Sequence, residues 1–255
     1  MTDRVGTLGW AQATNGMLRP RDRVAIVRQA IAVQLEGVAG RSRRRLGVGA
    51  DRLARVDLHE LRLPDSALCR EAERICEEAT PRTIVNHAYR SYLWATILAS
   101  RDRLHFDEEL LYVACLLHDV GFVESEDPAG PRCFTLKGAE AALALPDAAG
   151  WSEERKRVAA EAITMHLNLR VPLDGGTEPY LTFAGSRLDA IGYRAWHLHL
   201  DTMEAVVGRY PREGMKDAFA RTMNAQAAMS PGSRAHFYTR RLRGNRFVQQ
   251  APFAE

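Results

Sequence analysis

Apolar positions along the chain recur with the period of a helix rather than that of a strand. Residues 22–38 predict an amphipathic helix, and the glycine- and arginine-rich stretch 37–49 predicts a loop after it. Further helices are expected over residues 66–78, 80–100, 107–119, 135–145, 152–166, 177–196, 201–208, 214–228 and 232–243. No two neighbouring segments alternate as the strands of one sheet do, so the pattern predicts an all-α fold.

Side chains suited to helix capping mark several of these starts. Thr80 precedes Pro81, which predicts an N-cap followed by proline at the first helical position. Asp107 and Ser152 each precede two glutamates, and acidic side chains in the first turn are favoured by the helix dipole. The element bounds therefore rest on local chemistry as well as on periodicity.

A chain of 255 residues with 46% hydrophobic content can bury the core of one domain with appendages. No apolar run approaches the roughly 18 residues of a spanning helix, and the first residues lack a signal-like apolar core, so a cytoplasmic protein without a membrane segment is expected. Cys69, Cys76, Cys115 and Cys133 show no CxxC spacing. We expect reduced thiols without a chemical role.

The net charge of +3 is unevenly distributed. Residues 1–50 carry nine basic and three acidic side chains, and residues 201–255 carry nine and five, whereas residues 51–200 carry 17 and 24. The basic ends could contact phosphates, although solvated surface charge is the commoner explanation. The acidic middle argues against a nucleic-acid groove across the centre, so nucleic acid is not an expected partner.

The stretch LLHDVG, residues 116–121, places a histidine and an aspartate together at a predicted helix end. His118 continues the apolar stripe of its helix and should face the core. Asp119 lies in the last turn, where the helix dipole disfavours a carboxylate by about 0.3–1 kcal/mol. No lysine or arginine stands within one helical turn. A bound divalent metal would supply the missing positive charge.

Three further polar side chains lie on predicted core-facing stripes: His87, His166 and Asp189. Each alone is more often a core residue with a private hydrogen-bond partner than a ligand. Four helices that each turn a ligand type inward favour one shared cation, which would neutralise the carboxylates and orient the imidazoles. The remaining histidines, His59, His105, His197, His199 and His236, are interpreted as surface residues.

The ordered set His87, His118-Asp119 and Asp189 resembles the H…HD…D ligands of the HD superfamily, an all-helical group of metal-dependent hydrolases. The segments PRTIVNHAYRSYLWA, ELLYVACLLHDVGF, CFTLKGAEAALAL, AEAITMHLNL and SRLDAIG are similar in order and spacing to its cyanamide-hydratase-like branch. The resemblance covers about residues 62–196. It implies an HD-domain helical bundle, with a catalytic core over 62–200, an N-terminal extension over 1–61 and a C-terminal helical extension over 201–255.

The resemblance also implies a ligand set. The dinuclear members need two further histidines between the HD pair and the last aspartate, and only His166 stands there. We therefore expect a mononuclear site of His87, His118, Asp119 and Asp189. By resemblance the divalent metal is zinc, with iron, manganese and nickel left open. The nucleotidase branch carries a glutamate where this chain has Phe122, which argues against nucleotidase chemistry.

These expectations lead to an enzyme that acts on a small molecule. The metal would activate water for attack on a nitrile or cyanamide-like group, or on a phosphate or amide bond. Asp119 and His166 are the expected catalytic residues, with His166 as general acid and base or as a structural neighbour. Asn86, Arg90 and Lys137 are candidate substrate contacts. A silent binding or regulatory protein and an iron-dependent oxygenase remain alternatives, and a homodimer is an open expectation.

Overall fold

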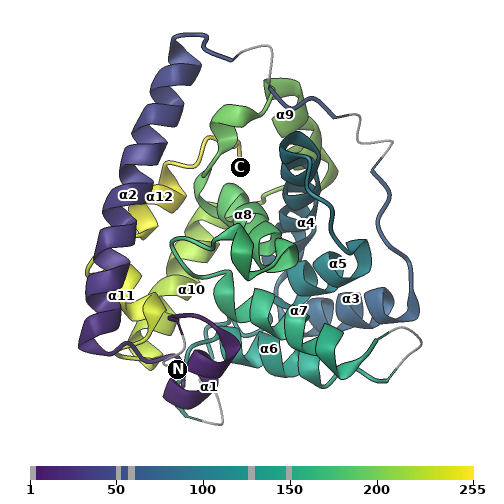
Figure 1. Ribbon diagram of the computed structural model, residues 1–255, viewed down its shortest axis with the longest axis vertical. Helices are drawn as coiled ribbons and strands as arrows, with labels where there is room; N and C mark the ends of the chain where they lie inside the picture. The colour runs from purple at the N-terminus through teal and green to yellow at the C-terminus, as the bar shows by residue number, and fades with distance from the viewer. Residues whose placement is uncertain (1–3, 50–52, 57–60, 126–129, 148–150) are drawn as a thin grey trace.

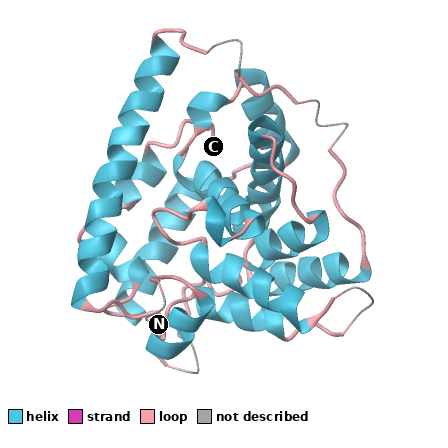
Figure 2. Ribbon diagram, viewed as in Figure 1, coloured by secondary structure: helices cyan, strands magenta, loops and turns pink. Residues whose placement is uncertain are grey.

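The computed structural model describes residues 4–49, 53–56, 61–125, 130–147 and 151–255. Within them the chain forms twelve α-helices and no β-strand, which confirms the predicted all-α fold (Figures 1 and 2). The helices are α1 (Leu8–Thr14), α2 (Pro20–Arg45), α3 (Ala67–Ala79), α4 (Arg82–Asp102), α5 (Glu108–Leu117), α6 (Thr135–Leu143), α7 (Glu153–Met165), α8 (Thr177–Ile191), α9 (Leu200–Arg209), α10 (Met215–Met229), α11 (Arg234–Arg240) and α12 (Asn245–Gln249).

The centre of the fold is the pair α4 and α8. Nearly every side chain of α4 between Ile84 and Ala99 is buried. Gly185 of α8 lets the two helices approach closely, because a Cβ atom there would overlap the carbonyl oxygen of Ser91. Helices α5 and α7 also pack on this pair and complete the main core. A polar side chain on α4 or α8 is therefore held by rigid neighbours on several sides.

The loop predicted over residues 37–49 is wrong, because α2 continues to Arg45. Gly37 and Gly40 lie inside the helix, and a Cβ atom at Gly40 would overlap the indole ring of Trp196. The glycine is thus a packing position rather than a helix stop. Three arginines occupy the last turn of α2, where the helix dipole favours positive charge.

Helix α2 presents part of its apolar surface to solvent. Ile26 and Val33 face the protein, whereas exposed apolar side chains follow another stripe: Val24, Val27, Ile31, Leu35 and Val38. The amphipathic pattern that predicts this helix is therefore only partly used for core packing. The expected homodimer stays a prediction.

The other helix bounds differ modestly from those expected. Helix α8 ends at Ile191, before residue 196, because Gly192 adopts a left-handed conformation with φ of 71°. The short helices α1 and α12 carry no periodic signal and were not expected. All four cysteines are buried and free. Among the described residues, no helix is long and apolar enough to cross a membrane.

Candidate metal centre

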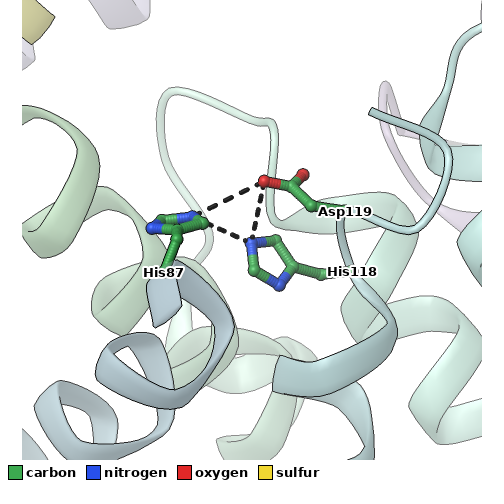
Figure 3. A group of neighbouring side chains, drawn as sticks. All are labelled: His87, His118 and Asp119. Carbon is green, nitrogen blue, oxygen red and sulfur yellow. Dashed lines mark hydrogen bonds and ion pairs between the residues drawn. The ribbon is translucent and has the colours of Figure 1, made fainter. Parts of the chain in front are cut away.

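Three potential ligand atoms meet where α4 faces the end of α5 (Figure 3). The Nε2 atoms of His87 and His118 are 3.2 Å apart. The Oδ2 atom of Asp119 lies 3.5 Å from the first of these nitrogens and 3.3 Å from the second. All three side chains are buried. The structure thus brings together the HD pair and the histidine predicted 31 residues before it.

The turn after α5 sets the positions of His118 and Asp119. The helix ends at Leu117, two residues earlier than predicted, so Asp119 lies in a turn rather than in the last helical turn. Gly138 of α6 packs against this turn, because a Cβ atom there would overlap the carbonyl oxygen of Leu117. The close approach of α6 supports the backbone that carries both side chains.

Hydrogen bonds to the far nitrogen fix the orientation of each imidazole. The Nδ1 atom of His118 donates to the carbonyl oxygen of Cys115 at 2.7 Å. The Nδ1 atom of His87 lies 2.7 Å from Oδ2 of Asp189. In the neutral rings these bonds place the proton on Nδ1, so both Nε2 atoms present lone pairs to the centre.

The electrostatics of the centre favour a negatively charged Asp119. Burial acts to raise the pKa of Asp119, but His118 and His166 outweigh it and hold that pKa well below its usual range. Burial acts to lower the pKa of His118, and Asp119 more than reverses this, so the pKa is raised. Burial lowers the pKa of His87 despite the neighbouring Asp189. The negative charge of Asp119 that attracts a proton to His118 would equally attract a metal ion, which replaces that proton when it binds the imidazole nitrogen.

This donor set fits a divalent metal ion. Zinc binds imidazole nitrogen and carboxylate oxygen at about 2.0–2.2 Å in tetrahedral sites, which places neighbouring ligand atoms about 3.3–3.6 Å apart. The three separations of 3.2, 3.3 and 3.5 Å agree with one face of such a tetrahedron. A divalent cation between the three atoms would take the place of the proton that Asp119 favours on His118 and would neutralise the buried carboxylate.

Asp189 takes a different place from the one predicted for it. Its Oδ1 atom accepts hydrogen bonds from Arg90 at 2.7 Å and from Trp94 at 2.9 Å. Its Oδ2 atom accepts another from Arg90 at 2.9 Å and contacts Nδ1 of His87. Both oxygens are thus occupied, on the ring edge of His87 opposite to the one that faces His118. This arrangement does not support Asp189 as a direct ligand and assigns it instead to orienting His87.

His166, the C-cap residue of α7, completes the wall of the centre. Its Nδ1 atom donates to the carbonyl oxygen of Ile163 at 2.6 Å, and its Nε2 atom lies 3.4 Å from Oδ1 of Asp119. Burial lowers the pKa of His166 to about 4. The ring is therefore neutral near pH 7, with a lone pair on Nε2 that can accept a proton or a hydrogen bond.

A cavity of about 260 Å³ opens onto this centre. His87, His118, Asp119 and His166 are among the residues that line it. Its walls come from α2, α8 and the C-terminal helices, and most of the side chains are apolar, among them Val33, Phe134, Ile191, Phe219, Met223 and Phe247. Segments before and after residues 62–196, the range of the sequence resemblance, therefore contribute to the cavity.

The three substrate contacts predicted from sequence do not line this cavity. Arg90 is completely buried, with its guanidinium on Asp189 and on the carbonyl oxygens of Tyr210 and Pro211. Asn86 is 1% exposed, and its amide donates to the carbonyl oxygen of Pro211. Lys137 is exposed and lies at a separate small pocket. The sequence predicts which helices surround the site, but it does not predict the direction in which their polar side chains point.

Other cavity residues were missed at the sequence level. Arg187 of α8 lines the cavity, two positions before Asp189, and Tyr238 of α11 lines it from the C-terminal segment. A lone arginine or tyrosine carries no spacing signal, so only the fold identifies them. Among the histidines interpreted as surface residues, His105 is exposed, whereas His197, His199 and His236 are partly buried, and His59 lies outside the described residues.

Comparisons with known proteins agree with the chemistry of the centre. Residues 84–185 match the family model of the HD domain. The cyanamide hydratases DDI2 and DDI3 of Saccharomyces cerevisiae are each 26% identical to this chain over 178 residues, which cover 66% of this chain and 76% of each yeast protein. The resemblance inferred from the ordered histidines and aspartates is confirmed, and an HD domain implies that a divalent metal is bound.

Proposed function

We propose that this chain, a metal-dependent enzyme of the HD superfamily, is a hydratase that adds water to the carbon–nitrogen triple bond of a small molecule. The substrate carbon gains the water oxygen, the nitrogen gains both protons, and a nitrile becomes an amide. The observation that supports this proposal most strongly is the apolar cavity that opens onto the cluster of His87, His118 and Asp119. The similarity to two yeast cyanamide hydratases supports the same reaction type.

His87, His118 and Asp119 are the residues that would hold the metal, and we favour zinc because the donor separations suit tetrahedral coordination. When bound, such an ion lowers the pKa of a coordinated water towards 7 and polarises an unsaturated substrate. Asp189 keeps the proton of His87 on Nδ1, so that Nε2 remains a ligand.

Proton movement falls to Asp119 and His166. The Nε2 atom of neutral His166 lies beside Oδ1 of Asp119 in the lining of the cavity. It can accept a proton from the attacking water and return it to the substrate nitrogen. The apolar walls favour an uncharged reacting group on the substrate, such as a nitrile, and they limit the access of other water molecules.

A phosphate ester is less well matched to this site. Phosphoryl transfer relies on cations placed around the reacting phosphate. In the described part of the chain, the cavity lining contains two basic side chains, Arg41 and Arg187. Neither belongs to the metal cluster. Arg90 cannot serve a phosphate in this arrangement, because its guanidinium is hydrogen-bonded to both carboxylate oxygens of Asp189.

The test combines metal analysis with a substrate panel. Purified protein is analysed for zinc, iron, manganese and nickel, and is then offered cyanamide, aliphatic nitriles, amides, phosphomonoesters and nucleotides. We expect about one equivalent of zinc and formation of amide or urea products. Turnover restricted to phosphate esters or amides would overturn the proposal, and iron with substrate-dependent oxygen uptake would indicate an oxygenase instead.

A further inference from the structure

Arg187 is a cation on the cavity wall, and none of the carboxylates that the structure describes pairs with it. Its Nη1 atom donates to the carbonyl oxygens of Asn168, at 3.3 Å, and Leu169, at 2.8 Å. Its guanidinium lies over the ring of Tyr193, with 5.0 Å between the guanidinium carbon and the ring centroid. Among the described residues no carboxylate lies within ion-pair distance of it, and its Nε atom has no hydrogen-bond partner.

The nearest acidic neighbour does not neutralise this guanidinium directly. Glu36 acts on Arg187 only at longer range, because its carboxylate accepts a hydrogen bond from Tyr193 and pairs with Arg170. Among the described residues that line the cavity, one side chain is acidic. It is Asp119, which belongs to the metal centre. Buried charges in proteins are usually paired, so an unpaired arginine on a cavity wall marks a place for an anion.

Two hydroxyl groups on the same wall also lack partners. The Tyr238 side chain is 8% exposed, and its hydroxyl has no hydrogen-bond partner in the structure. The hydroxyl of Thr239, the next residue, is likewise unpartnered. Tyr238 is near enough to Arg187 for the guanidinium charge to act on its phenol. Unsatisfied polar groups are rare in protein interiors, and a bound ligand would satisfy them.

The cavity is far larger than the reacting group of a hydratase requires. Cyanamide has three heavy atoms, whereas about 260 Å³ is roughly eight to nine times the volume that one water occupies in the liquid. Apolar side chains such as Met223 and Phe247 line the cavity as well, and Phe219 packs edge-on against the ring of His87 with 5.8 Å between the ring centroids. A substrate that fills the cavity needs an apolar body as well as a reactive end.

We infer that Arg187 binds a carboxylate at one end of an elongated apolar substrate whose other end reacts at His87, His118 and Asp119. The substrate class is an apolar nitrile that carries a carboxylate, an assignment that rests on the proposed hydratase function. A carboxylate suits this position because a planar guanidinium offers paired N–H donors to its two oxygens. The hydroxyls of Tyr238 and Thr239 are buried and unpartnered in the structure, and a rotation of either one toward the cavity would let it donate to the same group.

The first experiment measures binding without any reaction. Hexanoate, hexanol and hexylamine are titrated into the purified protein by calorimetry. We expect hexanoate to bind at least tenfold more tightly than the other two. The Arg187→Gln variant should remove this preference, and Arg187→Lys should keep part of it. Circular dichroism establishes that each variant is folded.

Arg41→Gln is the matched control, because it removes the other cavity-lining cation from the exposed surface of α2. This variant should retain the preference for hexanoate. Equal hexanoate binding by wild type and Arg187→Gln would overturn the inference and place the carboxylate on the metal or elsewhere. Loss of the preference in Arg41→Gln alone would overturn it as well.

The second experiment compares 5-cyanopentanoate with hexanenitrile as substrates. Wild type should favour the carboxylate by at least tenfold in kcat/KM, and Arg187→Gln should lose that ratio because its KM for 5-cyanopentanoate rises more than its KM for hexanenitrile. If the protein hydrates no nitrile but binds hexanoate through Arg187, the proposed function fails and the anion subsite stands. If nitriles are hydrated without a preference that depends on Arg187, the subsite fails and the proposed function stands.

Discussion

The carboxylate of Asp189 lies 2.7 Å from Nδ1 of His87, on the ring edge opposite to the candidate metal ligands. Both oxygens of the same carboxylate accept hydrogen bonds from Arg90. Metal-binding histidines commonly donate their other nitrogen to a carboxylate, which fixes the tautomer and strengthens the ligand. The Arg90, Asp189 and His87 chain therefore connects the buried charges of α4 and α8 to the metal centre.

Replacing Asp189 with asparagine should weaken metal binding by about 10–100-fold, because His87 loses its carboxylate partner. Stability should fall too, since Arg90 is left as a buried, unpaired charge. Metal affinity is measured by competition with a chromogenic chelator. The Trp94→Phe variant is the control, because it removes one donor to Asp189 but leaves the contact with His87. Unchanged metal affinity in Asp189→Asn would contradict the orienting role.

Removal of a direct ligand should have a larger effect than removal of Asp189. His118→Ala and Asp119→Ala should each purify with less than about a tenth of the wild-type metal, because three donors surround one position. Elemental analysis of the purified variants gives the measurement. His105, which is exposed, is changed to alanine as the control and should retain full metal. Full occupancy in both ligand variants would exclude this centre.

His166→Gln should separate proton transfer from metal binding. The variant retains His87, His118 and Asp119, so we expect metal content near that of wild type. Its kcat should fall by about 10²–10⁴-fold, because an amide cannot accept the proton that the Nε2 atom of His166 accepts. Steady-state kinetics and metal analysis are carried out on the same preparation. Loss of metal together with activity would instead identify His166 as a ligand.

The sequence predicted the fold class and the core of the site because both depend on periodicity. His87, His118 and His166 sit on apolar stripes, and a buried stripe dictates which helix face meets the interior. The direction of a side chain within that interior depends on its neighbours. Asp189 was predicted to bind the metal and Arg90 to contact the substrate, because their spacing in the sequence does not indicate that they bind each other.

The cavity walls could not be predicted for a related reason. Gly40 looks like a helix stop in sequence, yet it is the point at which Trp196 packs against α2. The C-terminal helices contribute Tyr238 and Phe247 from segments with no recognisable motif. Contacts between distant segments fix these positions, and local patterns do not encode such contacts.

Acid should destabilise the protein partly through His197. Burial, together with Arg101 and Arg194, lowers the pKa of His197 to about 4, and its Nε2 atom accepts a hydrogen bond from Trp196 at 3.1 Å. The unfolded chain therefore takes up this proton first, and stability falls as the pH drops from about 6.5 to 4. Above pH 7 this contribution is constant.

The measurement is the urea midpoint of metal-free protein at several pH values between 7.5 and 4.5. His197→Gln should lose less stability over this range than wild type, because its amide does not titrate. His87 and His166 have lowered pKa values as well, so part of the dependence should remain. The exposed His105, changed in the same way, serves as the comparison. Equal slopes for wild type and His197→Gln would refute the contribution of His197.

The close approach of α4 and α8 should be sensitive to a single methyl group. In Gly185→Ala the new Cβ atom would overlap the carbonyl oxygen of Ser91 and press on Ala95, so the helices must separate. We expect a loss of about 1–3 kcal/mol in the free energy of unfolding. Metal affinity should also fall, because α4 carries His87 and α8 carries the Asp189 that orients it.

Gly208→Ala in α9 is the matched control, since a Cβ atom there meets nothing within 4 Å. That variant should gain up to about 1 kcal/mol from helix propensity. A Gly185→Ala protein with wild-type stability and metal affinity would show that the distance between α4 and α8 does not control the centre.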